Sequence, residues 1–92
     1  MVTMKKRFNS IAIFSSLDSN KILKISQQIE EILDSLQIRK IYPKTSKINF
    51  ESNKRLYTDS YVIKNADLVI AIGGDGTLLS AARKFGLMGV PV

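Results

Sequence analysis

The stretch that decides the fold is Asp67-Leu-Val-Ile-Ala-Ile-Gly-Gly-Asp-Gly-Thr77. Its unbroken run of apolar residues predicts a strand over residues 67–72, buried on both faces as in the centre of a parallel sheet. The glycines end this strand, and the helix-forming residues that follow predict a helix over 77–85 with Gly86 as its C-cap. A strand that leads through a tight turn into a helix is typical of α/β proteins.

The same alternation extends toward the N-terminus. Contiguous apolar residues at 11–14 predict a buried strand within 7–16. The next segment predicts an amphipathic helix, N-capped by Asp18 or Ser19 and ending near residue 36, because its apolar residues recur at spacings of three and four. These residues are Ile22, Ile25, Ile29, Ile32, Leu33 and Leu36.

Elsewhere the patterns are weaker. Residues 38–42 predict a second strand closed by Pro43, and Val90 begins another. Residues 44–55 predict a loop with room for a short helix, and 56–65 remain ambiguous between helix and strand. The order of elements predicts an α/β fold with a mainly parallel sheet. Since residues 89–92 look like the start of a buried strand, we expect the sequence to be the front part of a longer protein.

Composition excludes several kinds of site. The 92 residues include no Cys and no His, which excludes disulfides, Ser-His triads, and thiolate or imidazole metal sites within this sequence. The apolar run near the N-terminus is too short for a signal peptide, and no run approaches a membrane span. We therefore expect a cytoplasmic protein with no membrane partner. The net charge of +6 suits an anionic ligand.

The glycine-rich turn is the candidate site, because ligands of open parallel sheets bind beyond the carboxyl ends of the strands. Gly73, Gly74 and Gly76 permit positive φ and let a ligand approach the backbone. The N–H groups at the start of the next helix favour an anion such as phosphate. Residues 74–79 fail the Gly-x-Gly-x-x-Gly dinucleotide pattern at the last position, and no Walker A string occurs.

Asp75 is the informative residue, because a carboxylate repels a phosphate unless a cation or a hydroxyl lies between them. It could accept a hydrogen bond from a sugar hydroxyl, remove that proton as a general base, or help to hold Mg²⁺. The alternative is an ordinary turn, in which Asp and Gly are common.

Residues 67–83 resemble the signature of NAD kinases, and Gly89-Val-Pro-Val92 also resembles that family. The Gly-Gly-Asp-Gly core is shared with diacylglycerol and sphingosine kinases and with phosphofructokinases. The Leu78-Leu79-Ser80 that follows separates this sequence from them. The resemblance covers residues 67–92, and residues 1–66 are compatible with the family's amino-terminal domain.

The resemblance implies that residues 1–92 form a Rossmann-like amino-terminal α/β nucleotide-binding domain, incomplete without the family's carboxy-terminal domain. It implies phosphoryl transfer from ATP to the 2′-hydroxyl of the adenosine ribose of NAD, with Mg²⁺ accompanying the nucleotide and no residue assigned as a metal ligand. Asp75 would be the general base. Gly73, Gly74 and Gly76 would enclose the phosphates and ribose, and Thr77 would open the helix and donate a hydrogen bond.

Other interpretations stay open. Many members of the family carry Arg or His where this sequence has Ser80, so that charged role is not transferred. The 92 residues alone are expected to be inactive, and the full-length protein is expected to form a homo-oligomer. The alternatives are a non-catalytic nucleotide-binding fragment, or a lipid or sugar kinase. Nucleic-acid binding through the basic residues and Tyr42, Tyr57 and Tyr61 is not expected, because charge alone specifies no site.

Overall fold

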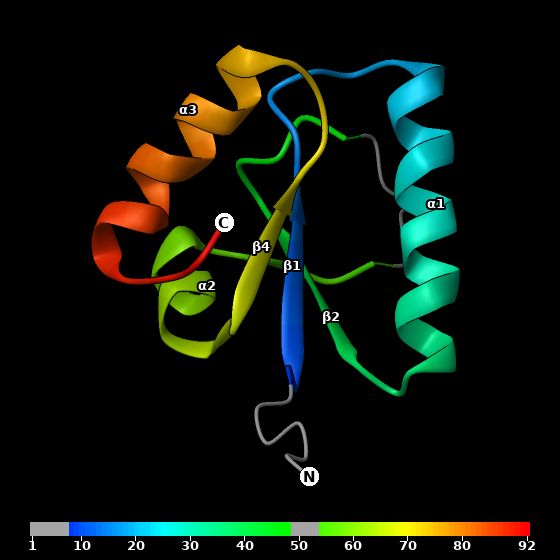
Figure 1. The fold of residues 1–92 in the computed structure, drawn as a ribbon, viewed down its shortest axis with the longest axis horizontal. Helices are drawn as coiled ribbons and strands as arrows, with labels where there is room; N and C mark the ends of the chain where they lie inside the picture. The colour runs from blue at the N-terminus through cyan, green and yellow to red at the C-terminus, as the bar shows by residue number, and fades with distance from the viewer. Residues whose placement is uncertain (1–7, 49–53) are drawn as a thin grey trace, which may run out of the picture.

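A parallel sheet forms the centre of the computed structural model, which describes residues 8–48 and 54–92 (Figure 1). The strands are β1 (Ser10–Phe14), β2 (Arg39–Pro43), β3 (Leu56–Tyr57) and β4 (Leu68–Ala71). Their spatial order is β3-β2-β1-β4, and every neighbouring pair is parallel. The predicted α/β fold with a mainly parallel sheet is confirmed.

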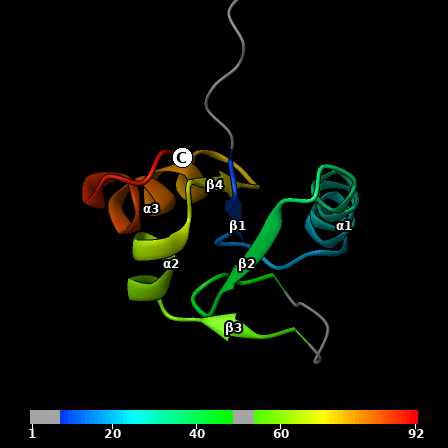
Figure 2. The ribbon, with the colours of Figure 1, turned by 90° about the horizontal axis from the view of Figure 1, so that it is seen from below.

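Helices cover both faces of this sheet (Figures 1 and 2). Helix α1 (Asn20–Ser35) lies on one face, while α2 (Asp59–Asn65) and α3 (Asp75–Lys84) lie on the other. Successive side chains of a strand point to opposite faces. In β1, Ile11 and Ile13 accordingly join the core beneath α1, and Ala12 and Phe14 join the core beneath α2 and α3. The contiguous apolar residues of β1 reflect burial on both sides.

Helix α1 begins as predicted, since Ser19 is its N-cap and the Ser19 hydroxyl accepts the Ile22 N–H at 3.2 Å. The predicted apolar stripe was too wide. Ile22 and Leu33 are buried, but Ile32 is 57% and Leu36 is 61% exposed. Ile32 lies about 100° around the helix from Leu33, at the edge of the stripe. Leu36 lies beyond the last helical residue, where the chain turns away from the helix.

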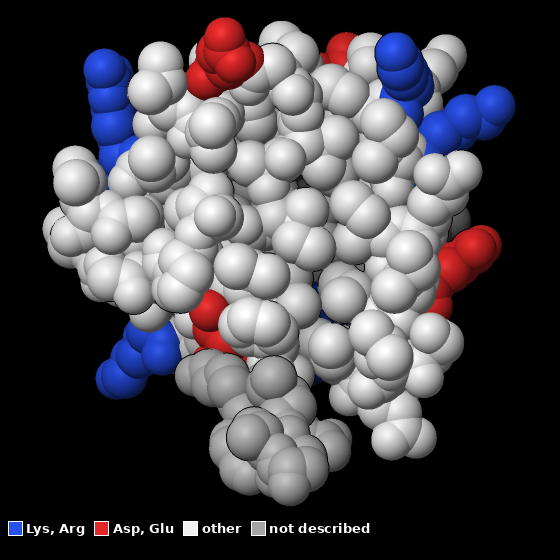
Figure 3. Space-filling view, in the orientation of Figure 1, with Lys and Arg blue, Asp and Glu red and all other residues white. Residues whose placement is uncertain are grey.

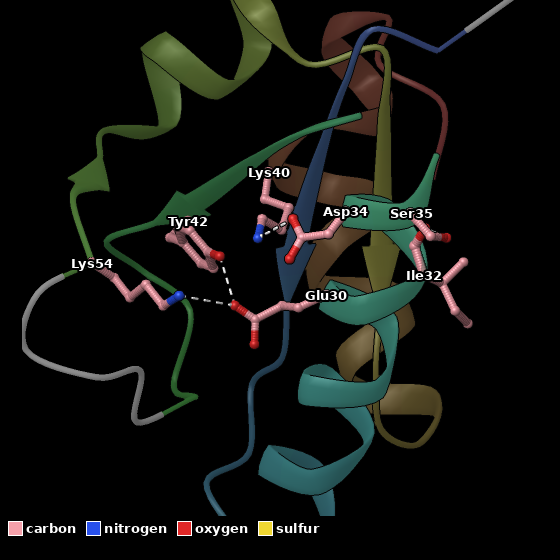
Figure 4. Close-up of polar contacts among 7 residues, drawn as sticks. All are labelled: Glu30, Ile32, Asp34, Ser35, Lys40, Tyr42 and Lys54. Carbon is pink, nitrogen blue, oxygen red and sulfur yellow. Dashed lines mark hydrogen bonds and ion pairs between the residues drawn. The ribbon is translucent and has the colours of Figure 1, made fainter. Parts of the chain in front are cut away.

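Polar contacts attach α1 to β2 and to Lys54, the first residue described after the segment 49–53 (Figure 4). The Tyr42 hydroxyl donates to Glu30 Oε2 at 2.6 Å, and Lys54 Nζ lies 3.4 Å from the same oxygen. Lys40 Nζ pairs with Asp34 Oδ1 at 2.5 Å. Because Tyr42 is buried, its hydroxyl needs a partner, and Glu30 supplies one. The predicted loop over 44–55 lies partly in this undescribed segment.

Residues 56–65, which were ambiguous from sequence, form β3 and α2. Thr58 caps α2 by accepting the Tyr61 N–H at 3.2 Å. The rings of Tyr57 and Tyr61 stack with centroids 4.1 Å apart, and Arg39 donates to both hydroxyls. The hydrogen bonds to Tyr61 and then Tyr57 raise the pKa of the Arg39 guanidinium above its ordinary value. This cluster joins β2, β3 and α2.

Strand β4 departs from its predicted central position, because β1 occupies the centre and β4 forms one edge of the described sheet. No strand is assigned at Val90 within the described residues, although Val90 is buried and the Val69 N–H donates to Pro91 O at 2.8 Å. The predicted C-cap is also wrong. A 3₁₀ turn over Gly86–Met88 follows α3, so Phe85 is the C-cap and the left-handed glycine is Gly89, at φ 95°.

Among the described residues, no helix combines the length and apolar character needed to cross a membrane.

Two isoleucines in different environments test this packing. Ile13→Ala should lower the free energy of unfolding by about 2–5 kcal/mol, because the side chain is fully buried between the sheet and α1. Ile32→Ala should change it by less than about 0.5 kcal/mol, because Ile32 is mostly exposed. Urea denaturation followed by circular dichroism measures both, and equal losses at the two positions would contradict the described core.

Candidate functional site

The carboxyl ends of β1 and β4 lie side by side where the strand order reverses. From β1 the chain passes through α1 to β2 on one side, whereas from β3 it passes through α2 to β4 on the other side of β1. The Ile72 N–H donates to Phe14 O at 2.9 Å, which extends the pairing to the end of both strands. Ligands of open parallel sheets bind at such a reversal. The glycine turn after β4 and residues 15–17 after β1 meet there.

Gly73 is required by the chain itself. It has φ +141°, a conformation that residues with a side chain rarely adopt. A Cβ at this position would lie 2.6 Å from Thr77 Oγ1 and 3.6 Å from Leu17 Cδ1. The turn can therefore bring α3 against the loop after β1 only with glycine at position 73.

Gly74 and Gly76 differ from Gly73. Apart from their chain neighbours and the nearby backbone of α3 itself, no described atom would lie within 4 Å of a Cβ at either residue. Neither residue has positive φ. Internal packing therefore gives no reason for glycine at these two positions. Their missing side chains leave the backbone at the start of α3 open to an approaching ligand.

Helix α3 begins at Asp75, two residues before the predicted start at Thr77. Its N-cap is Gly74, which has no side chain to bond the first turn. Within the described residues, the N–H groups of Asp75 and Gly76 have no acceptor. They add to the positive end of the helix dipole, an arrangement that favours an anion.

Asp75 is exposed, and its side chain makes no hydrogen bond or ion pair with the part of the chain that the structure describes. It occupies the first turn of α3, between the two glycines that internal packing does not require. Its carboxylate is therefore available to a hydroxyl or a cation of a ligand.

Thr77 is placed differently from the other predicted site residues, because its side chain is only 2% exposed. Its Oγ1 lies 2.6 Å from Ser16 Oγ, and the Ser16 N–H approaches the same oxygen at 3.4 Å. The sequence prediction missed Ser16, together with Ser15 and Ser46, which also lie at this edge of the sheet. The adjacent serines directly after the first strand were the available signal, since that strand ends at the same edge.

Two cavities flank the turn. One, of about 450 Å³, opens beside Gly73 and is lined by Leu17, Ser19, Lys21, Ile22, Ile25 and Ile72. The other, of about 460 Å³, is lined by Gly76, Leu79, Ser80, Arg83 and Lys84. Both volumes fall within the usual range of ligand sites. Ser80 is neutral, so the positive charge of the second cavity comes from Arg83 and Lys84 one turn further along α3.

A divalent cation fits this site only in the company of a ligand. Among the described residues, no group of three or more acidic side chains is close enough to hold a metal ion. Asp75 offers one carboxylate beside the turn. Mg²⁺ commonly binds through one or two carboxylates together with substrate phosphates, so Asp75 suits an ion that arrives with a nucleotide.

Comparison with known proteins gives a consistent result. Residues 3–92 match the family described as the ATP-NAD kinase N-terminal domain. An NAD kinase of Citrifermentans bemidjiense is 32% identical over an alignment of 90 positions, which covers 89% of this chain and 29% of that protein. An NAD kinase of Methylococcus capsulatus is 29% identical over 89 residues, which are 97% of this chain and 31% of that protein. The chain thus spans less than a third of the length of these relatives.

Paired glycine substitutions test the two kinds of glycine in the turn. Gly73→Ala should lower the free energy of unfolding by about 1–3 kcal/mol. Alanine would have to adopt a positive φ at this position, and its Cβ would clash with the Thr77 side chain. Gly74→Ala should change it by less than about 1 kcal/mol, because no clash or positive φ occurs there. Thermal unfolding compares the two variants, and a larger loss for Gly74→Ala would contradict the described turn.

Proposed function

The chain belongs to the NAD kinase family, and we propose that the polypeptide carrying it transfers a phosphoryl group from ATP to the 2′-hydroxyl of the adenosine ribose of NAD, giving NADP. One observation carries this proposal. The exposed carboxylate of Asp75 has no partner in the described chain, and it stands between two glycines whose open space lies beside the free N–H groups of Asp75 and Gly76 at the start of α3.

These features suit a reaction in which a hydroxyl meets a phosphate. Asp75 accepts a hydrogen bond from the ribose hydroxyl, orients it, and takes its proton as the oxygen attacks the γ-phosphorus of ATP, whose bond to the β,γ-bridging oxygen breaks to release ADP. The N–H groups of Asp75 and Gly76 face phosphate oxygens, and the bare backbone at Gly74 lets the nucleotide come close. Magnesium bound to the nucleotide supplies charge that stabilises the transferring group.

The competing interpretations receive less support. A lipid or sugar kinase would share the glycine core, whereas the family match extends over residues 3–92. Nucleic-acid binding would need a continuous basic surface, and on the face seen in Figure 3 the Lys and Arg side chains stand apart at the rim. Tyr57 and Tyr61 stack on each other, and the hydroxyl of Tyr42 is bonded to Glu30.

Other expectations remain predictions. These are the homo-oligomer of the full-length protein, the cytoplasmic location and the incomplete amino-terminal domain. Because the chain covers 29% and 31% of the two relatives described above, a nucleotide-binding fragment without turnover remains the alternative for these 92 residues alone.

The test is an assay of the full encoded polypeptide with NAD, ATP and MgCl₂, in which an NADP-specific dehydrogenase detects the product. Asp75→Asn should lower kcat by at least about 100-fold, because the amide cannot take a proton. Asp34→Asn is the control, since Asp34 is an exposed carboxylate near the end of α1 and away from the glycine turn, and its kcat should not change.

Unchanged turnover by Asp75→Asn would refute the general-base role. Phosphorylation of diacylglycerol or sphingosine in place of NAD would favour the lipid-kinase alternative. Nucleotide binding by the full polypeptide without any turnover would favour the non-catalytic one.

A further inference from the structure

We propose that Ser16 and Thr77 are positioning residues, whose paired hydroxyls hold the glycine turn against the loop after β1 and so fix the direction of the Asp75 carboxylate. The pair acts through the turn and does not touch the reacting atoms. The inference rests on the proposed function, because it assigns the two hydroxyls to the orientation of the proposed general base.

The Thr77 hydroxyl contacts two parts of the chain at once. Its Oγ1 lies 2.6 Å from Ser16 Oγ, 61 residues away in the sequence, and near the Ser16 N–H at 3.4 Å. It also fills the space where Gly73 has no side chain. Because Thr77 is almost fully buried, removing the Ser16 hydroxyl would cost Thr77 Oγ1 its 2.6 Å partner and leave it only the long contact with the Ser16 N–H.

This contact sets the rotation of the first turn of α3. Asp75 precedes Thr77 by two residues, which places the two side chains about 200° apart around the helix axis. When Thr77 points inward to Ser16, Asp75 must point outward to solvent, as its exposure shows. A change at the Thr77 contact would therefore rotate the carboxylate away from a bound hydroxyl.

The loop that carries Ser16 is itself held firmly, so it can serve as a support. The Ser15 N–H donates to Ser46 Oγ at 3.1 Å, and the Lys47 N–H donates to Ser15 O at 2.7 Å. The Leu17 N–H donates to Ser15 Oγ at 3.0 Å. All the side chains in these contacts are neutral hydroxyls, which support the turn without repelling a phosphate beside it.

Four variants of the full encoded polypeptide test the proposal by NADP formation. Thr77→Val keeps the shape but removes the hydroxyl, and kcat should fall about 10- to 100-fold while KM for NAD changes by less than about threefold. Thr77→Ser keeps a hydroxyl and should restore kcat to within about threefold of the parent. Ser16→Ala should lower kcat as much as Thr77→Val does. The double variant Ser16→Ala/Thr77→Val should lower kcat no further than the more damaging of the two single substitutions, because both residues act through one contact.

A second readout does not depend on activity. In Thr77→Val, the ¹⁵N order parameters of Gly74 and Gly76 should fall while those of α1 stay constant, and Thr77→Ser should preserve them. Full kcat in Thr77→Val, additive losses in the double variant, or unchanged order parameters would each overturn the proposal. If the parent forms no NADP, the proposed function fails, and the order parameters alone decide whether the hydroxyl pair holds the turn.

Discussion

The parallel pairing of β1 with β4 is the constraint on which the rest of the structure depends. Its partners are far apart in the sequence, with Ile11 opposite Leu68. At the amino end, Asp67 Oδ2 accepts the N–H groups of Asn9 at 2.6 Å and Ser10 at 3.1 Å, which fixes the start of both strands. A shift of one residue would turn the core side chains of β4 to the opposite face of the sheet. It would also separate the glycine turn from the loop that follows β1.

The glycine turn satisfies two independent demands, and the structure separates them. Glycine at position 73 is required by the fold, because its positive φ and its close approach to Thr77 exclude a side chain. Gly74 and Gly76 face open space and meet no such constraint. No contact within the described chain accounts for these two glycines, and they lie at the first turn of a helix, where an anionic ligand finds free N–H groups. The proposed nucleotide site therefore rests on the second kind of glycine.

Local patterns predicted what local interactions decide. The contiguous apolar residues of β1 were interpreted correctly, and Ser19, the cap of α1, was one of the two predicted caps, because these signals lie within a few residues of one another. The edge position of β4 could not be read, because a run of apolar residues does not reveal how many neighbours a strand has. Ser16 and Thr77 were not paired for the same reason, since their contact exists only after β1 and β4 have joined. The predicted start of α3 was late, because a glycine N-cap carries no side-chain signal.

The two aspartates that begin helices show how position alone fails to define a role. Asp59 opens α2 and is bound by the chain, since it accepts the Thr45 hydroxyl at 2.7 Å and lies 3.5 Å from Lys84 Nζ. Asp75 opens α3 at the equivalent position and has no partner among the described residues. The helix dipole stabilises the negative charge of both carboxylates, so this interaction does not distinguish them. What distinguishes Asp75 is the strand reversal beside it and the glycines on either side, which leave its carboxylate exposed and without a partner in the described chain.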